Sequence, residues 1–342
     1  MEKKKITVKD LAKILDVSIS TISKALNDSH EISKETKQKV QNVAKQYNYT
    51  PNKLASSLKS GKTRTIGVII PSIKNRFFAR VLFGIDNIAT KENYNVITCI
   101  SNESFKKEVT NVQVLANGSI DGFIIALAKE TQIKQDFSHF NEAILQGKPI
   151  VMFDRVTKMV ACDTVTVDDF EASYQATKHL IHSNCKNIAV ISIIDPLSVG
   201  KLRVEGYKKA LNESFQKIDP NLIVIADIST LEKKITKLFQ NQKVDGVLAI
   251  DEDASLATLK IAKSKGFKIP NELSIIGYAN EKIATNVTPT LTTINQHGVT
   301  IGESAAKILI NKLENDTTSF DEKIIKSTLI ERNSTNIKNK NL

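Results

Sequence analysis

The stretch TVKDLAKILDVSISTISKALN, residues 7–27, decides how the first part of this chain folds. Asp16-Val17-Ser18 separates two helical patterns, and Ser18 is a favourable N-cap for the second helix. The apolar stripe of the first helix is Val8, Leu11, Ala12 and Leu15. In the second helix, the residues predicted to face inward are Ile19, Ile22 and Leu26, and the outward stripe is Ser20, Thr21, Lys24 and Asn27. This order predicts a helix-turn-helix that places small polar and cationic side chains in a DNA major groove.

Two further helices are predicted before residue 62. Ser33 caps the first of them, whose apolar stripe is Val40, Val43, Ala44 and Tyr47. Thr50-Pro51 is a second start signal, because Pro is favoured at the first helical position. The segment from Asn52 to Leu58 then forms about two turns, and a helix that short needs a partner to persist in water. Leu58 could be a wedge between minor-groove base steps or a simple dimer contact.

The basic charge of the chain is concentrated in this first part. Residues 1–64 carry 14 Lys and Arg against 6 Asp and Glu, a net +8 of the total +11. A localised excess of this kind is the electrostatic footprint of phosphate binding. Binding to a membrane surface would need a strongly apolar, aromatic helix face, which these helices lack.

Composition indicates a cytoplasmic protein. Cys99, Cys162 and Cys185 are odd in number and scattered, which indicates a reducing compartment. Cys99 lies in an apolar run and is predicted to be buried. We expect no signal peptide, and no stretch approaches the ~18 apolar residues of a membrane span.

From Thr65 onward, apolar runs alternate with helical stretches. The predicted strands are Thr65–Pro71, Asn95–Ile100, Gly122–Ala126 and Pro149–Phe153, and in a second series Asn187–Ile191, Leu222–Ala226, Gly246–Ala249 and Leu273–Tyr278. Continuous apolar strands separated by helices predict parallel sheets covered on both faces. The two series predict two similar subdomains, whose strand carboxyl ends can face each other across a ligand cleft.

Several motifs together resemble the lactose-repressor (LacI/GalR) family of bacterial transcription regulators. They are Thr7–Ala12, Val17-Ser18, Thr21–Lys24, Asn27, Tyr49–Asn52 and Leu58–Thr63. The resemblance implies a homodimer on a pseudo-palindromic operator of double-stranded DNA. It places Ile19, Ser20 and Ser23 at base-reading positions, and Thr7, Ser18, Thr21, Lys24, Asn27 and Thr36 where they touch or orient the phosphate backbone. It places Asn52, Lys53, Ala55 and Leu58 on a hinge helix in the minor groove.

The resemblance also implies a periplasmic-binding-protein-like core whose cleft binds a small effector. The candidate cleft residues are Ser72, Asn75, Phe77, Phe78, Ser101, Asn102, Asp154, Arg155, Arg203, Asp251, Glu252 and Asn280. Arg203 matches a position where sugar-binding members of the family hold ligand hydroxyls. Ala279 stands where the family usually has an Asp that contacts the effector, so either Asn280 takes that role or the effector differs.

Each of these candidates also has a plainer structural explanation. Phe77 and Phe78 could be core residues, and Arg203 could pair with a neighbouring carboxylate. Acids at 251–253 fit a helix N-terminus better than a metal site, and His179 with His182 has no evident third ligand for zinc. The GKT of residues 61–63 lacks the earlier glycine and the preceding strand of a phosphate-binding loop. No metal or other cofactor is expected.

The sequence therefore predicts four segments. They are a small all-α helix-turn-helix headpiece (1–49), a hinge helix and linker (50–62), an α/β core of two doubly wound parallel-sheet subdomains (63–332) and a disordered tail (333–342). The predicted function is that of a sequence-specific DNA-binding transcription regulator, a repressor, with no enzymatic activity and no membrane partner. A sugar or sugar phosphate in the cleft is expected to control operator affinity. The alternative ligand is a purine stacked on Phe77 or Phe78. The alternative protein classes are a solute-binding protein without a DNA role and an enzyme, but the sequence has no nucleophile elbow, GxGxxG or HExxH motif that would indicate an enzyme.

Overall fold

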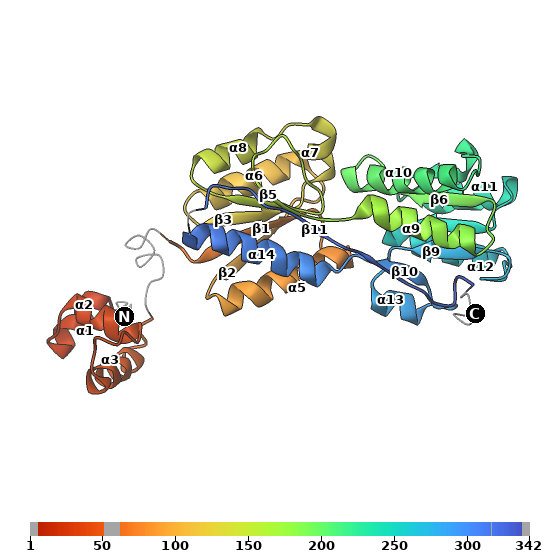
Figure 1. Ribbon diagram of the computed structural model, residues 1–342. Coiled ribbons are helices and arrows are strands. Elements are labelled where there is room, and N and C mark those ends of the chain that lie inside the picture. Colours follow the sequence, from red (N-terminus) through yellow and green to blue (C-terminus); the bar gives the residue numbers. More distant parts are fainter. Residues whose placement is uncertain (1–5, 51–61, 316, 337–342) are drawn as a thin grey trace. The chain divides into compact units, whose positions relative to one another are not determined.

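The computed structural model describes residues 6–50, 62–315 and 317–336. The chain divides into two compact units, Met1–Thr63 and Arg64–Leu342, shown in Figure 1. The predicted hinge-helix residues Asn52, Lys53, Ala55 and Leu58 lie outside the described residues.

Within residues 6–50, the described part of the first unit is a bundle of three helices. Its helices are α1 (Val8–Leu15), α2 (Ile19–Leu26) and α3 (Lys34–Gln46). Thr7, Ser18 and Ser33 each cap one helix, because their side-chain oxygens accept a hydrogen bond from a backbone N–H in its first turn. The buried core of the unit is Leu11, Ala12, Ile22, Ala25, Val40 and Ala44. The predicted caps Ser18 and Ser33 are thereby confirmed.

Two of the residues predicted to face inward in this unit do not. Ile19 is 46% exposed and Tyr47 is 47% exposed. Ile19 is the first residue of α2, and Tyr47 is the C-cap of α3. A residue at a helix end lacks a flanking turn on one side, so helical spacing alone does not press it against the bundle. Tyr49 packs against the core beyond the end of α3.

The second unit contains two six-stranded sheets (Figure 1). The first sheet has the order β11-β5-β4-β3-β1-β2, with parallel neighbours. Its strands are β1 (Thr65–Ile70), β2 (Asn95–Ile100), β3 (Gly122–Ile125), β4 (Ile150–Phe153), β5 (Asp163–Val167) and β11 (Glu322–Ile325). Its covering helices are α5 (Arg76–Lys91) and α14 (Gly298–Asn315) on one face, and α6 (Phe105–Ala116) and α8 (Ser138–Leu145) on the other. Burial on both faces explains the continuous apolar runs of β3 and β4.

The second sheet has the order β12-β10-β9-β8-β6-β7, with β12 antiparallel to β10. Its strands are β6 (Ile188–Ser192), β7 (Ile223–Ile225), β8 (Gly246–Ala249), β9 (Ser274–Gly277), β10 (Thr292–Asn295) and β12 (Thr328–Ile330). Helices α9 (Asp169–His182) and α10 (Ser198–Glu213) cover one face, and α11 (Leu231–Asn241) and α12 (Glu252–Ser264) cover the other. Two six-residue helices, α7 (Lys129–Lys134) and α13 (Glu281–Asn286), follow β3 and β9.

The chain passes between the two sheets three times. It crosses after β5, after β10 and between β11 and β12. Subdomain 1 is therefore residues 64–167 and 298–325, and subdomain 2 is residues 168–295 and 328–336. Several covalent connections at one boundary allow a hinge between two rigid bodies.

The predicted disordered tail begins too early. Ser334 and Thr335 are 0% and 1% exposed. The Ser334 hydroxyl donates to the Ile275 carbonyl at 2.6 Å and accepts from the Thr292 N–H at 2.8 Å. Ser334 and Thr335 therefore belong to subdomain 2, because their side chains complete hydrogen bonds beside β9 and β10. Residues 337–342 lie outside the described part of the chain.

Candidate functional site

The predicted DNA-reading residues lie on and around α2. Ile19, Ser20 and Ser23 are exposed and fall within its first five residues. The N-terminal part of a recognition helix is the part that contacts base edges. An isoleucine there can touch a thymine methyl but cannot hydrogen-bond a base.

The predicted backbone-contacting residues surround this surface and also hold the bundle together. Thr7, Ser18 and Asn27 are exposed, whereas Thr21, Lys24 and Thr36 are half-buried. The hydroxyls of Ser18 and Thr21 lie 2.9 Å apart, as do those of Ser33 and Thr36. Lys24 forms an ion pair with Glu31. Any phosphate that reached Lys24 would therefore compete with an existing carboxylate partner.

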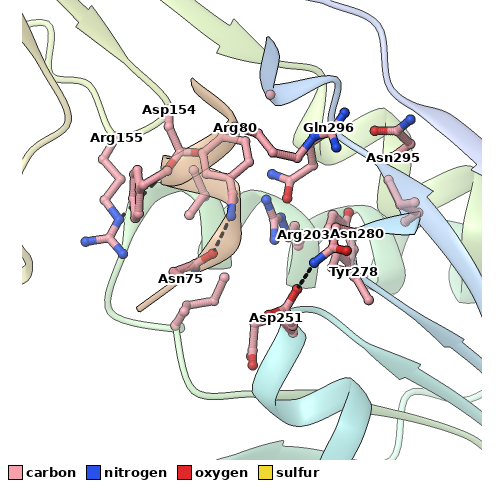
Figure 2. Close-up of a pocket in the computed structure, with 18 of the residues that line it drawn as sticks. Asn75, Arg80, Asp154, Arg155, Arg203, Asp251, Tyr278, Asn280, Asn295 and Gln296 are labelled. Carbon is pink, nitrogen blue, oxygen red and sulfur yellow. Dashed lines mark hydrogen bonds and ion pairs between the residues drawn. The ribbon is translucent and has the colours of Figure 1, made fainter. Parts of the chain in front are cut away.

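The second unit contains a cavity at the carboxyl ends of strands from both sheets (Figure 2). It encloses about 850 Å³, counting the solvent at its open mouth. Subdomain 1 contributes the residues after β1 and β4, and subdomain 2 those after β6, β8 and β9 and at the end of β10. This is where open parallel sheets bind ligands.

Nine of the twelve predicted cleft residues line this cavity. They are Asn75, Phe77, Phe78, Asp154, Arg155, Arg203, Asp251, Glu252 and Asn280. Ser72, Ser101 and Asn102 do not line it. Ser101 and Asn102 follow β2, which lies at the edge of its sheet, and Ser101 is fully buried. The Ser72 hydroxyl instead accepts a hydrogen bond from the Lys74 N–H at 3.1 Å.

The structure adds polar lining residues that the sequence prediction missed, namely Arg80, Tyr278, Glu281, Asn295 and Gln296. Tyr278 directly follows β9, so the strand-end rule could have found it, whereas Asn295 ends β10, a strand that the sequence did not predict. Arg80 lies on α5, about one turn beyond the cavity residues at its start, and helical spacing alone indicates that position.

Arg203 is held by groups of subdomain 2. Its Nε donates to Asp169 Oδ1 at 2.6 Å and its Nη1 donates to the Ile250 carbonyl at 2.7 Å. Its guanidinium carbon lies 3.9 Å from the centre of the Tyr278 ring. The plainer explanation of Arg203 as the ion-pair partner of a neighbouring carboxylate is thus correct, and that carboxylate belongs to Asp169. A guanidinium has five N–H donors, so this pairing still leaves donors for the cavity.

Asp154 is a buried carboxylate whose negative charge has few stabilising contacts from the protein. Its residue is 8% exposed, and its nearest ionic partner is Arg155, with 3.9 Å between Oδ2 and Nε. Burial raises the pKa of Asp154 to about 6, and the positive charge of Arg155 opposes that rise. In the described part of the chain, the Asp154 side chain accepts no hydrogen bond. Arg155 Nε is likewise buried without a hydrogen-bond partner among the described residues. Both groups line the cavity, so a ligand there can supply the missing partners.

The acids on the opposite wall are already engaged. Asp251 caps α12 by accepting from the Ala254 N–H at 2.8 Å and also accepts from the Ile193 N–H at 2.9 Å. Burial raises the pKa of Asp251 to about 6 against the effect of these hydrogen bonds. Asn280 donates to Glu252 Oε2 at 3.2 Å, while its oxygen caps α13. The role proposed for Asn280 at the cleft is thus shared with a structural one.

The two aromatic residues after β1 differ in exposure. Phe78 is 1% exposed and packs edge-on against Phe153, with the ring centres 6.2 Å apart. Phe77 is half-buried, and its ring centre is 5.3 Å from that of Phe78. Phe78 therefore belongs to the core, and Phe77 offers the more accessible ring at the cavity.

Comparison with known proteins decides the family. Residues 63–333 match the family described as periplasmic binding proteins and sugar binding domain of the LacI family, and residues 7–52 match bacterial regulatory proteins of the lacI family. The chain belongs to the LacI family. The predicted family and fold class are thus confirmed: this LacI-family chain is a transcription regulator with a helix-turn-helix unit and a ligand-binding core.

Individual relatives of this LacI-family chain match more than nine-tenths of its length. The HTH-type transcriptional regulator RegA of Clostridium saccharobutylicum is 30% identical over 334 residues, covering 96% of this chain and 99% of RegA. Catabolite control protein A of Priestia megaterium is 31% identical, covering 91% and 94%. The Lac repressor dimer bound to operator and the anti-inducer ONPF shares the fold, with a TM-score of 0.84 at 18% identity over 97% of this chain and 99% of that one.

A solved structure with a ligand named in its title is similar to the core of this LacI-family chain. It is a LacI family transcriptional regulator from Enterococcus faecium with bound ribose, 28% identical, with a TM-score of 0.69 over 79% of this chain and 98% of that one. Within residues 6–50, 62–315 and 317–336, no group of three or more His, Cys, Asp and Glu side chains could hold a metal ion. Of the helices that the structure describes, none is long and apolar enough to cross a membrane.

Proposed function

We propose that this LacI-family regulator binds operator DNA as a homodimer in the cytoplasm, and that a sugar or sugar phosphate in the core cavity changes its operator affinity. The protein has no catalytic role in this proposal. The relatives are named as transcriptional regulators, which supports this assignment.

The observation that carries the ligand class is the state of Asp154. A largely buried carboxylate that lacks hydrogen-bond donors from the protein needs them from water or from a bound group in the cavity. Sugar hydroxyls donate to carboxylates and accept from a guanidinium such as Arg203. The apolar side chains of Leu197 and Val199 on the same cavity wall suit the C–H face of a sugar ring.

Arg80 is the residue that can distinguish a sugar phosphate from a neutral sugar. It lines the cavity, is exposed, and makes no ion pair within the described residues. A guanidinium recognises phosphate oxygens through paired hydrogen bonds. A phosphorylated sugar would use Arg80, whereas a neutral sugar would not need it.

A thermal-shift screen of the full chain tests the proposal, using matched sugars and sugar phosphates, nucleosides and purine bases. A concentration-dependent rise in Tm is expected for a sugar or its phosphate. The rise should be lost in Asp154→Asn and kept in the matched control Asp253→Asn, because Asp253 is exposed and does not line the cavity. Loss of the rise in Arg80→Gln would identify the phosphorylated form.

The same screen can overturn the proposal. A rise for purines alone would replace the sugar with a base stacked on Phe77. A sample that binds operator DNA selected from random sequence, yet responds to none of the compounds, would exclude this ligand class.

A further inference from the structure

A polar contact joins the two subdomains outside the covalent crossings. Gln132 on α7 of subdomain 1 donates through Nε2 to the Ser198 hydroxyl at 3.0 Å, and its Oε1 accepts from the Ser198 N–H at 3.3 Å. Figure 1 shows α7 and α10 at neighbouring ends of the two subdomains. Gln132 is 8% exposed, so water competes little for these bonds. Ser198 lies between Leu197 and Val199, which line the cavity.

Helix α7 is held in place by carboxylates from elsewhere in subdomain 1. A six-residue helix does not persist alone, and Ala128 at its N-cap has no side-chain oxygen to cap it. The fully buried Glu108 accepts instead from the Ala128 N–H at 2.6 Å and from the Thr131 hydroxyl at 2.5 Å. Glu103 Oε2 accepts from the Lys129 N–H at 2.8 Å. Glu103 and Glu108 thus replace the missing cap and fix the position of Gln132.

The same Glu103 oxygen connects α7 to the cavity wall. Arg155 Nη1 donates to Glu103 Oε2 at 2.7 Å, so Arg155 and α7 share one acceptor atom. Arg155 lines the cavity next to Asp154, and its Nε is buried without a hydrogen-bond partner among the described residues. A ligand group that binds Asp154 or Arg155 Nε is therefore separated from α7 only by Glu103, which accepts hydrogen bonds from both Arg155 and the Lys129 N–H of α7.

We propose that Gln132 and Ser198 form a clasp that favours the closed arrangement of the two subdomains, and that Glu103 links this clasp to the cavity through Arg155. The clasp adds a reversible connection to three crossings that can act as hinges. Its link to the ligand rests on the function proposed above. Gln132, Glu103 and Glu108 are positioning residues, because none of the three lines the cavity.

The clasp can be tested on the ligand-free full chain by pulsed electron paramagnetic resonance. Spin labels at Lys106→Cys on α6 and Lys201→Cys on α10 report the distance between the subdomains, since both positions are exposed. The half-buried Cys99 is replaced by Ser, and labelled protein is diluted with unlabelled protein to suppress distances between protomers. Gln132→Met replaces the side chain with one of similar size and removes both hydrogen bonds to Ser198. It should raise the ratio of open to closed molecules by at least about threefold, which is what the loss of ordinary hydrogen bonds gives.

Gln132→Glu is the matched variant. Its carboxylate accepts from both the Ser198 N–H and the Ser198 hydroxyl, but it cannot replace the hydrogen bond that Gln132 Nε2 donates to the Val156 carbonyl of subdomain 1 at 3.4 Å. The distance distribution should therefore return most of the way to that of the starting protein. A Gln132→Met distribution identical to the starting one would overturn the clasp. Equal opening in Gln132→Met and Gln132→Glu would overturn the hydrogen-bonded contact as its basis.

Glu103→Gln tests the link to Arg155 by removing the shared negative charge. It should open the subdomains in the same direction as Gln132→Met, and an unchanged distribution would overturn the link while leaving the clasp. Because no ligand is present, these outcomes are independent of the thermal-shift screen. If no compound raises Tm in the screen, the distance measurements still test the clasp. If the distance measurements overturn the clasp, the sugar proposal is unaffected.

Discussion

Asp154 combines the burial of a core residue with the chemistry of a binding residue. Its pKa is raised to about 6 by burial, so ionisation at neutral pH costs stability. The sign follows from the ordinary Asp pKa of about 4: this contribution favours the fold below about pH 4 and is lost as pH rises through 6. The site therefore gives up stability for a carboxylate that can bind ligand hydroxyls.

Asp154→Asn should make the ligand-free protein more stable at pH 7.5. A rise of about two pKa units corresponds to roughly 3 kcal/mol as an upper limit. The gain should shrink towards pH 4.5, where Asp154 is protonated in the original protein. Urea denaturation at both pH values measures the difference, with Asp253→Asn as the exposed control. A gain that is the same at both pH values would contradict the assigned cause.

Ile19 is expected to read the operator by apolar contact. Ile19→Ala should weaken binding to the selected operator by about tenfold, because one base contact contributes roughly 1–3 kcal/mol of discrimination. Binding to random DNA and its salt dependence should stay unchanged, since both depend on phosphate contacts. Ile14→Ala is the matched control, because Ile14 is 47% exposed on α1. Fluorescence anisotropy at several salt concentrations measures all three quantities. Equal losses on operator and random DNA would argue against base reading.

The sequence predicts which residues follow a strand but not which distant residues come into contact. Asp154 and Arg155 could be placed in the cavity because they follow a strand whose end is easily predicted. The partner of Arg203 could not be identified, because Asp169 lies 34 positions away and only the packing of α9 against α10 joins them. The same limit hid the Gln132–Ser198 contact, which spans 66 positions.

Among the elements, strands with a long apolar run were predictable, including the edge strands β2 and β7, and strands interrupted by polar residues were not. All eight predicted strands of the core are present, although some bounds shift by a residue or more. Strands β5, β10, β11 and β12 were missed. Strand β5 alternates between buried and half-exposed residues, and β11 is largely exposed. Such strands carry Thr, Lys and Glu, so they lack the continuous apolar run that predicts a buried strand.

The pairing of α5 with α14 depends on two glycines. A Cβ atom at Gly302 would lie 2.0 Å from the Val81 carbonyl oxygen, and one at Gly84 would lie 2.1 Å from the Val299 carbonyl oxygen. Both neighbours are backbone atoms that cannot rotate away. The two helices must separate to admit a side chain, and α14 covers the sheet of subdomain 1.

Gly302→Ala should therefore lower the free energy of unfolding despite the better helix propensity of Ala. Overpacking costs about 1–3 kcal/mol, which exceeds the roughly 1 kcal/mol gained in propensity. Lys307→Ala, at an exposed position of the same helix, should change stability little. Chemical denaturation of the three proteins decides the matter. A Gly302→Ala protein more stable than the original would show that the helices separate without cost.

At the scale of the whole molecule, the end of the described chain closes the second subdomain. After the last crossing, the backbone N–H of Ile275 in β9 donates to the Ser334 carbonyl at 2.8 Å, and the Thr335 and Thr292 hydroxyls lie 2.8 Å apart. A chain that stops after Arg332 would leave the buried backbone N–H groups of Ile275 in β9 and Thr292 in β10 without the Ser334 atoms to which they donate. Each such group costs about 1–3 kcal/mol, so the urea midpoint should fall clearly. A chain that stops after Asn336 keeps all of these bonds and is the matched control. Equal midpoints for the two truncated chains would mean that water replaces Ser334 and Thr335, and the core would then end at residue 332 as the sequence predicts.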